Sequence, residues 1–230
     1  MNLLETELGE LKSNLLEMTN LVRSQLEKTD VAFFSFDKDL AKEVLKNEKR
    51  VNAQELQIDA KSEHILALFN PVAIDLRFVV AALKMVSNLE RIGDNSKGIS
   101  QCITKFEQPF DPALVGQLRF KEMMDTAIEM ISILSESFET DNTKLARTLF
   151  SKDEILDEIN VAANTIMTHY LAEEKNPEKI LQAIYMLTII RKMERIGDYV
   201  TNIAEEIIFY VKAKVLKHNR KKGGNKPMSS

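Results

Sequence analysis

Two copies of the pentapeptide Glu-Arg-Ile-Gly-Asp carry the residues of this 230-residue chain that are most suited to chemistry. They span residues 90–94 and 194–198 and are 104 residues apart. In each copy the glutamate and the aspartate are four residues apart, so that on a helix their carboxylates share one face. Carboxylate oxygens are ligands for hard cations such as Mg, Mn, Ca and Fe. The duplication therefore predicts two equivalent acidic sites, one in each half of the chain.

A second polar row precedes each pentapeptide. Its members have the spacing i, i+4 and i+7, and they are Glu48, Asn52 and Glu55 in the first half and Asp153, Asp157 and Asn160 in the second. Residues at this spacing lie along one face of a helix. In the first half they alternate with Val44, Val51 and Ile58, so the row stands on or beside the core-facing stripe. We expect each half to bring two acid-bearing helix faces together.

Carboxylates placed this closely need a compensating charge. Like charges at i, i+4 destabilise an isolated helix by roughly 0.2–0.5 kcal/mol, and a partly buried, unpaired carboxylate costs far more. Salt bridges from Arg91 and Arg195 would compensate them, and so would a bound cation. Gly93 and Gly197 each cost about 1 kcal/mol relative to Ala in a helix interior. They indicate that a neighbouring helix or an ion cluster approaches the backbone there, and spacing alone leaves these alternatives open.

The elements that must position these acids are helices. Apolar residues recur every three or four positions, the spacing of an amphipathic helix. Breaks fall at Asn70-Pro71, at residues 109–112 and at Asn176-Pro177, because the residue before a proline is disfavoured in a helix. This pattern predicts helices over about residues 4–33, 37–69, 71–106, 112–139, 142–174 and 177–215.

Three helices of about 30 residues with short connections pack as an antiparallel bundle. The predicted fold is therefore all-α, with two tandem, pseudo-repeated antiparallel three-helix bundles. We expect the first bundle to span residues 1–108, the second 109–215, and a basic, flexible tail 216–230.

Composition excludes several classes of protein. With 44% hydrophobic and 29% charged residues, the chain is a folded globular protein rather than a disordered one. Cys102 is the one cysteine, so an internal disulfide is impossible. The N-terminus lacks the layout of a signal peptide, and no apolar run is long enough to span a bilayer. Residues 211–230 hold seven Lys/Arg and no acid, which suits either an anionic partner or a solvated terminus.

Several segments of the chain resemble the PhoU family of phosphate-uptake regulators. They are residues 70–77 (Asn-Pro-Val-Ala-Ile-Asp-Leu-Arg) with 89–94, and residues 193–198 with 209–212 (Phe-Tyr-Val-Lys). The resemblance extends in order from about residue 5 to 215. It implies two tandem three-helix bundles, in agreement with the periodicity. The Asp-Leu-Arg element at residues 75–77 has no counterpart after Pro177, and the basic tail inherits no role from the family.

The resemblance also implies metal binding, since acidic motifs form multinuclear metal sites in some members. Carried over by position, the ligands are Glu48, Asn52, Glu90 and Asp94 in the first half and Asp153, Asp157, Glu194 and Asp198 in the second, with Glu55 and Asn160 as secondary candidates and Arg91 and Arg195 as the salt-bridge alternative. The implied cofactors are divalent or trivalent ions with oxygen ligands, namely Fe, Mn, Mg, Ca or Zn. Glu48 stands where members more often have Asp, and Asn52 is neutral. The second site is therefore expected to bind metal more tightly.

The function implied by the resemblance is regulation, not catalysis. Such a protein lowers phosphate uptake and signalling when phosphate is plentiful. The implied partners are the ATPase subunit of the phosphate ABC transporter and a sensor histidine kinase at the cytoplasmic membrane. The protein would be a cytoplasmic homodimer that is at most peripheral to the membrane and does not bind nucleic acid.

Three alternatives to this function are compatible with parts of the sequence. They are a metal-free helical scaffold, a paralogue that serves a different phosphate transporter, and a carboxylate-bridged di-metal enzyme. The enzyme ordinarily needs Glu-x-x-His on two helices. His64, His169 and His218 lack the glutamate three residues earlier, so no catalytic residues are predicted.

Overall fold

The computed structural model describes residues 3–213, in which every regular element is a helix. The all-α prediction is confirmed. The elements are α1 (Leu3–Ser35), α2 (Lys38–Phe69), α3 (Ala73–Lys105), α4 (Pro112–Gln117), α5 (Phe120–Glu139), α6 (Thr143–Glu173) and α7 (Pro177–Lys212). The predicted basic tail, 216–230, lies outside the described residues. Within residues 3–213 no helix has an apolar stretch long enough to cross a membrane.

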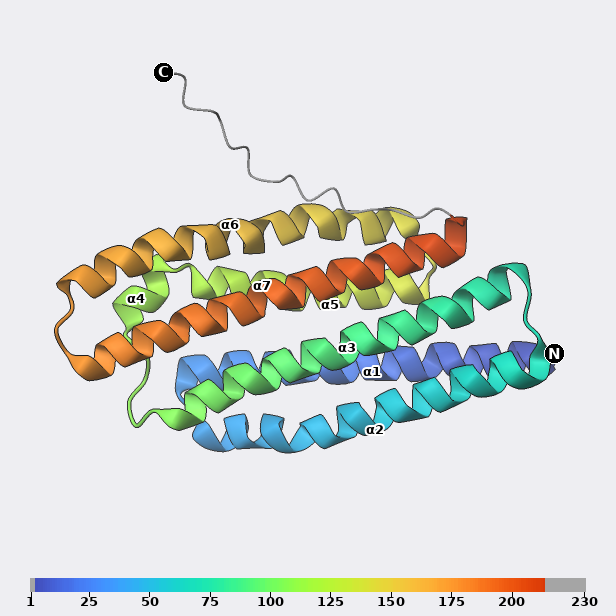
Figure 1. Cartoon of the computed structure of the whole chain (residues 1–230), viewed down its shortest axis with the longest axis horizontal. Helices are drawn as coiled ribbons and strands as arrows, with labels where there is room; N and C mark the ends of the chain where they lie inside the picture. Colours follow the sequence, from blue (N-terminus) through green and yellow to red (C-terminus); the bar gives the residue numbers. More distant parts are fainter. Residues whose placement is uncertain (1–2, 214–230) are drawn as a thin grey trace, which may run out of the picture.

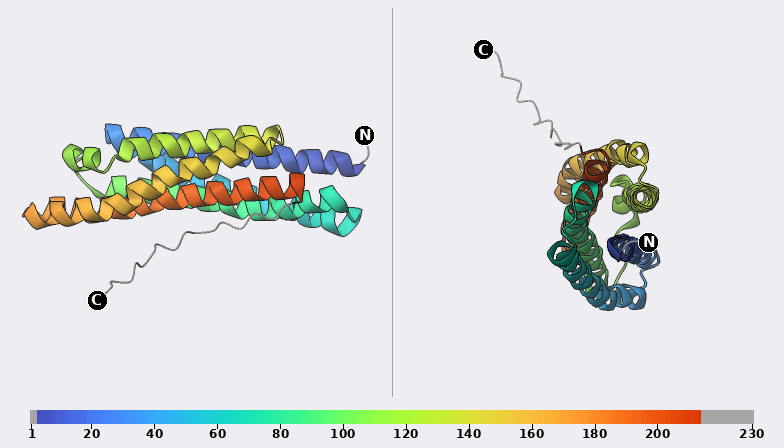
Figure 2. Two further views of the ribbon diagram at one scale, coloured as in Figure 1. Left: turned by 90° about the horizontal axis from the view of Figure 1, so that it is seen from above. Right: turned by 90° about the vertical axis from the view of Figure 1, so that its right-hand side faces the viewer.

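Four long helices lie side by side in the order α2, α3, α7, α6 (Figure 1). Viewed end-on they form an arc, with α1 and α5 packed on its inner side (Figure 2). The helices α1, α2 and α3 form one bundle, and α5, α6 and α7 form the other. The two third helices, α3 and α7, run along each other in the middle of the molecule. Because each carries one pentapeptide, both pentapeptides lie at this seam between the repeats.

Side-chain caps fix where the helices start. Asp37 accepts hydrogen bonds from two backbone N–H groups of the first turn of α2, and Asn142 does the same for α6. Asn176 accepts one from Glu178 N at the start of α7. At the other end of α2, Asn70 adopts the left-handed conformation with φ of 45°. Asn tolerates that conformation and so ends the helix just before Pro71.

The prediction of one helix over residues 112–139 is wrong, because the chain turns between α4 and α5. Arg119 has φ of 51° and separates the two helices. Leu114, Leu118 and Phe120 are all buried. On one continuous helix, Leu118 and Phe120 would point to nearly opposite faces. The turn allows both side chains to enter the core, at the cost of a left-handed residue.

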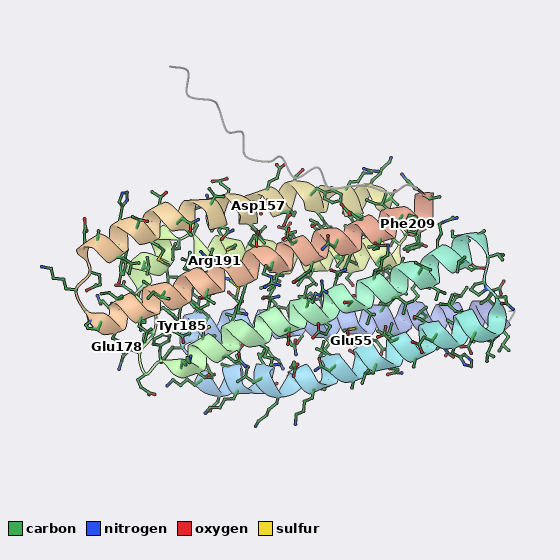
Figure 3. The ribbon with its side chains drawn as sticks, in the orientation of Figure 1. Glu55, Asp157, Glu178, Tyr185, Arg191 and Phe209 are labelled. Atoms are coloured by element: carbon green, nitrogen blue, oxygen red, sulfur yellow. The ribbon has the colours of Figure 1, made fainter. Side chains whose placement is uncertain are left out.

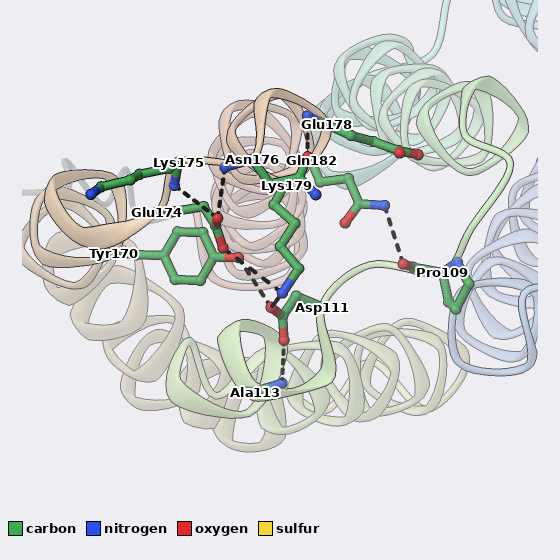
Figure 4. Close-up of polar contacts among 10 residues, drawn as sticks. All are labelled: Pro109, Asp111, Ala113, Tyr170, Glu174, Lys175, Asn176, Glu178, Lys179 and Gln182. Carbon is green, nitrogen blue, oxygen red and sulfur yellow. Dashed lines mark hydrogen bonds and ion pairs between the residues drawn. The ribbon is translucent and has the colours of Figure 1, made fainter.

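The connection between the two repeats is tied to α6 and α7 (Figure 4). Asp111 Oδ2 accepts a hydrogen bond of 3.1 Å from the Tyr170 hydroxyl and pairs with Lys179 Nζ at 3.2 Å. The buried amide of Gln182 donates to the carbonyl oxygen of Pro109 at 3.2 Å. These contacts hold the connecting segment against the start of α7 and so set how the second repeat follows the first.

Candidate functional site

The acidic cluster of the first repeat is held together by an ammonium group. Lys97 Nζ on α3 lies 2.9 Å from Glu48 Oε1 on α2 and 3.4 Å from Asp94 Oδ1. Glu48 also accepts a hydrogen bond of 2.9 Å from Asn52 Nδ2. The bond from Lys97 holds the pKa of Glu48 below its usual value. Sequence reasoning missed Lys97, although its place three residues after Asp94 was a signal for an ion pair on the helix.

The other predicted residues of the first half join the same cluster. Burial raises the pKa of Glu90, and the carboxylates of Asp94, Glu55 and Glu48 raise it further. Burial likewise raises the pKa of Glu55, together with the charges of Asp59 and Asp94. The expected convergence of acids from α2 and α3 is thus present.

The acidic cluster of the second repeat centres on Asp153 of α6, whose relative exposure is 4%. Burial raises the pKa of this carboxyl to about 7, and the charges of Asp157, Asp198 and Glu194 contribute. Its Oδ1 atom is buried and accepts no hydrogen bond from the described chain. Asp157 on α6 and Glu55 on α2 lie on opposite sides of the α3–α7 seam, so the two clusters are separate (Figure 3). Asn160 is half-buried one turn further along α6.

The two clusters differ in how their charge is compensated. The position in α7 that matches Lys97 after 104 residues is Thr201, whose hydroxyl donates to the carbonyl oxygen of Asp198. Asn52 of the first cluster corresponds to Asp157 of the second. The first cluster therefore contains a lysine and a neutral amide where the second contains a threonine and an acid. At these two matched positions the second cluster thus has one more acid and one fewer base than the first.

Both pentapeptide glycines make room for a neighbouring helix. A Cβ atom on Gly93 would lie 3.2 Å from Val51 Cγ1, and one on Gly197 would collide with Asp153 Oδ1. Close approach at these glycines was expected from their cost in a helix interior. In the second repeat the nearest approaching group is the carboxylate of Asp153. The lack of a side chain at Gly197 therefore leaves space for this acid between α6 and α7.

The donor atoms are of the type that a hard cation binds, but they are not grouped closely enough to bind one ion together. All predicted ligand side chains offer oxygen atoms, which Mg, Mn, Ca and Fe accept. Asp153 Oδ1 and Asn52 Oδ1 are buried and lack a hydrogen-bond partner in the described chain. As the side chains of residues 3–213 stand, no three His, Cys, Asp or Glu residues are grouped closely enough to hold one ion. Metal binding would therefore require the carboxylates to rotate toward one another.

The two pentapeptide arginines meet at Tyr199, next to the second pentapeptide. The guanidinium group of Arg91 lies 5.7 Å from the centre of the Tyr199 ring, and that of Arg195 lies 5.9 Å from it. Arg195 Nη2 also donates to the Tyr199 hydroxyl at 2.9 Å. With Lys192 they contribute to a polar pocket of about 430 Å³ between α3 and α7. Sequence reasoning missed Tyr199 and Lys192, since neither has a like residue at the matching position of the first half.

Comparison with known proteins agrees with this architecture. The family model described as "PhoU domain" matches residues 15–103 and again 120–207. The phosphate-specific transport system accessory protein PhoU of Escherichia coli is 31% identical over 214 residues, which cover 92% of this chain and 86% of that protein. PhoU homolog 1 of Thermotoga maritima is 29% identical, with 93% and 90% covered.

Solved structures extend the likeness to the fold. The crystal structure of PhoU from Pseudomonas aeruginosa has a TM-score of 0.85 and 28% identity, and covers 91% of this chain and 99% of that one. The regulatory protein PhoU from Streptococcus pneumoniae has a TM-score of 0.83 and 26% identity, covering 93% and 99%. The relatives are named as accessory or regulatory proteins, not as enzymes. Two matches to the PhoU domain, one in each repeat, show that this chain belongs to the PhoU family.

Proposed function

We propose that this protein is an accessory regulator of phosphate uptake that acts together with a phosphate transporter. The observation that carries the proposal is that the likeness to phosphate transport accessory proteins covers both repeats, and 92% of the chain in the case of the Escherichia coli protein. Helices α3 and α7 place both duplicated motifs at one seam, so the regulator acts as a single unit.

The finer features of this function follow from the family resemblance. The direct partner is the ATPase subunit of a phosphate ABC transporter, and a sensor histidine kinase receives the signal. The protein works in the cytoplasm as a homodimer that reaches the membrane through its partners. A regulator of this kind needs binding surfaces rather than a reaction centre, and no catalytic residue is assigned.

The two acidic clusters are the proposed sites for metal ions. Glu48, Asn52, Glu90 and Asp94 would hold metal in the first repeat, and Asp153, Asp157, Glu194 and Asp198 in the second. The ion would supply positive charge that the clustered carboxylates need, and its identity lies among Fe, Mn, Mg, Ca and Zn. Asp153 supports this assignment most strongly, because it is a buried acid with an oxygen that lacks a hydrogen-bond partner in the described chain.

The second candidate is a metal-free helical scaffold. It is favoured by the first cluster, where Lys97 already supplies a positive charge at 2.9 Å from Glu48. Elemental analysis of the protein purified without chelator or metal-affinity resin separates the two candidates. Near-stoichiometric metal supports the metal-binding regulator, whereas trace amounts favour the scaffold.

The regulatory function itself is tested by deleting the gene and measuring phosphate uptake and phosphate-responsive transcription at high external phosphate. We expect both to rise in the deletion strain and to return to normal when the wild-type gene is restored. A strain complemented with Glu194→Gln and Asp198→Asn tests whether the second cluster is needed. Unchanged uptake and transcription in the deletion strain would refute the proposed function.

A further inference from the structure

The pocket between α3 and α7 is built from both repeats. Arg91, Asp94 and Asn95 line it from α3, and Lys192, Arg195 and Tyr199 line it from α7, enclosing about 430 Å³. Both helices run side by side at this point (Figure 1). We propose that this pocket binds inorganic phosphate. The oxyanion chemistry follows from the lining, whereas the choice of phosphate among oxyanions rests partly on the proposed function.

The pocket gathers three cationic side chains and one acidic one. Within the described chain, Arg91, Lys192 and Arg195 form no ion pair with a carboxylate of another residue. Two guanidinium groups contact the ring of Tyr199, which brings two positive charges that repel each other into one pocket. A bound anion would relieve this repulsion. Guanidinium groups bind phosphate with two parallel hydrogen bonds, and lysine binds it as a point charge.

Lys192 is held in place by close packing. Its ammonium group lies against the backbone of Gly98 on α3, where a Cβ atom would be only 2.6 Å from Nζ. A larger residue at position 98 would displace the ammonium group. The absence of a side chain there therefore lets the ammonium group lie against α3 at the seam, in the pocket that the two arginines also line.

Asp94 should make the pocket bind phosphate in preference to sulfate. Near neutral pH, phosphate carries at least one hydroxyl group, which can donate a hydrogen bond to a carboxylate, whereas the sulfate dianion has no proton to donate. The Asp94 carboxylate therefore repels sulfate, and no hydrogen bond from sulfate offsets this repulsion. Asp94 Oδ1 faces Lys97 at 3.4 Å, so the same residue also links the pocket to the acidic cluster of the first repeat.

The test is isothermal titration of the full-length, metal-stripped protein with sodium phosphate and, separately, with sodium sulfate. We expect one phosphate per chain and weaker binding of sulfate. Each of Arg91→Gln, Lys192→Gln and Arg195→Gln should weaken phosphate binding about tenfold, equivalent to the loss of a charge-assisted hydrogen bond. Asp94→Asn should reduce the preference for phosphate over sulfate.

Arg191→Gln is the matched control. Arg191 is exposed on α7 next to Lys192 but does not line the pocket (Figure 3). Its replacement by Gln changes the net charge of the protein by the same amount as each of the three pocket variants. Its affinity for phosphate should stay within about twofold of the wild type, and thermal unfolding should show that every variant is folded. No saturable phosphate binding, or equal weakening by the control, overturns the proposal. Neither result touches the regulatory function, which the deletion strain tests separately.

Discussion

The carboxylate of Asp153 on α6 packs directly against the backbone of Gly197 on α7, in the position that a Cβ atom of residue 197 would take. The glycine of the second pentapeptide thus lies beside an acid as well as beside the apolar side chain of Leu156. In the first repeat the matching glycine, Gly93, faces Val51 and Gln25. The acid pair that recurs in the sequence is therefore embedded in two different environments.

Replacing Asp153 with Asn should stabilise the metal-stripped protein above about pH 4. The pKa of this carboxyl is about 7 in the folded chain, against 3.8 as its ordinary value. Below pH 4 the carboxyl is protonated in both the folded and the unfolded chain, so its burial carries no cost from a buried charge. Between pH 4 and 7 the unfolded state loses its proton while the folded state keeps it, and the free energy of unfolding falls by up to about 4 kcal/mol. Asp153→Asn should lack this decrease.

The measurement is urea unfolding with chelator present, from pH 4 to 8. Asp39→Asn serves as the control, because its carboxylate is 92% exposed in a pair with Lys42. It should change stability by less than about 0.5 kcal/mol. Parallel pH profiles for the wild type and Asp153→Asn would contradict the prediction.

Replacing Lys97 with Thr, the residue at the matching position of the second repeat, should destabilise the first bundle. It leaves Glu48 and Asp94 without the cation that pairs with them. We expect a loss of about 1–2 kcal/mol at pH 7, discounted for the partial exposure of the pair. Added divalent cation should restore part of the loss if the first cluster binds metal. Lys42→Thr, which breaks an exposed pair on α2, should cost much less, and an equal cost would argue against a special role for Lys97.

Metal content should depend more on Asp153 than on Glu48. Asp153 has a buried oxygen without a hydrogen-bond partner in the described chain, whereas Glu48 already contacts Lys97 and Asn52. A ligand that must first leave an ammonium group binds an ion less readily. Elemental analysis of Asp153→Asn and Glu48→Gln, purified in parallel without chelator, should show the larger loss of metal for Asp153→Asn. The reverse order would place the stronger site in the first repeat.

The hydroxyl of Tyr210 should stabilise the packing of the end of α7 against the turn between α5 and α6. Tyr210 is 5% exposed, and its hydroxyl donates to Asp141 Oδ1, which also pairs with Lys12 Nζ at 3.0 Å. Arg77 Nε of the first repeat donates to the carbonyl oxygen of Tyr210 at 3.3 Å. Tyr210→Phe should lower the free energy of unfolding by about 1.5 kcal/mol, the lower end of the net value of a hydrogen bond to a charged group, because Asp141 is half exposed.

Tyr185→Phe provides the comparison for this measurement. The Tyr185 hydroxyl contacts Lys105 at an exposed site, so its removal should cost less than about 0.5 kcal/mol. Urea unfolding of both variants at pH 7 is sufficient. If the two phenylalanine variants are equally stable, the hydrogen bond from Tyr210 to Asp141 does not contribute to stability.

Local patterns in the sequence were enough to predict most of the helices. Apolar spacing and the caps at Asp37, Asn142 and Asn176 depend on residues within one or two turns, and these signals are legible in the chain itself. The turn at Arg119 was missed because it depends on what lies outside the helix. Leu118 and Phe120 both find core space only when the chain changes direction.

The sequence alone determined the all-α repeat and the pairing of acids from two helices in each half, because helical periodicity fixes which side chains share a face. Only the tertiary structure decided what those acids meet. Lys97 reaches Glu48 across α2 and α3, and Arg91 reaches Tyr199 across the seam. Such contacts depend on how whole helices dock, which is set by the summed packing of many side chains rather than by local spacing.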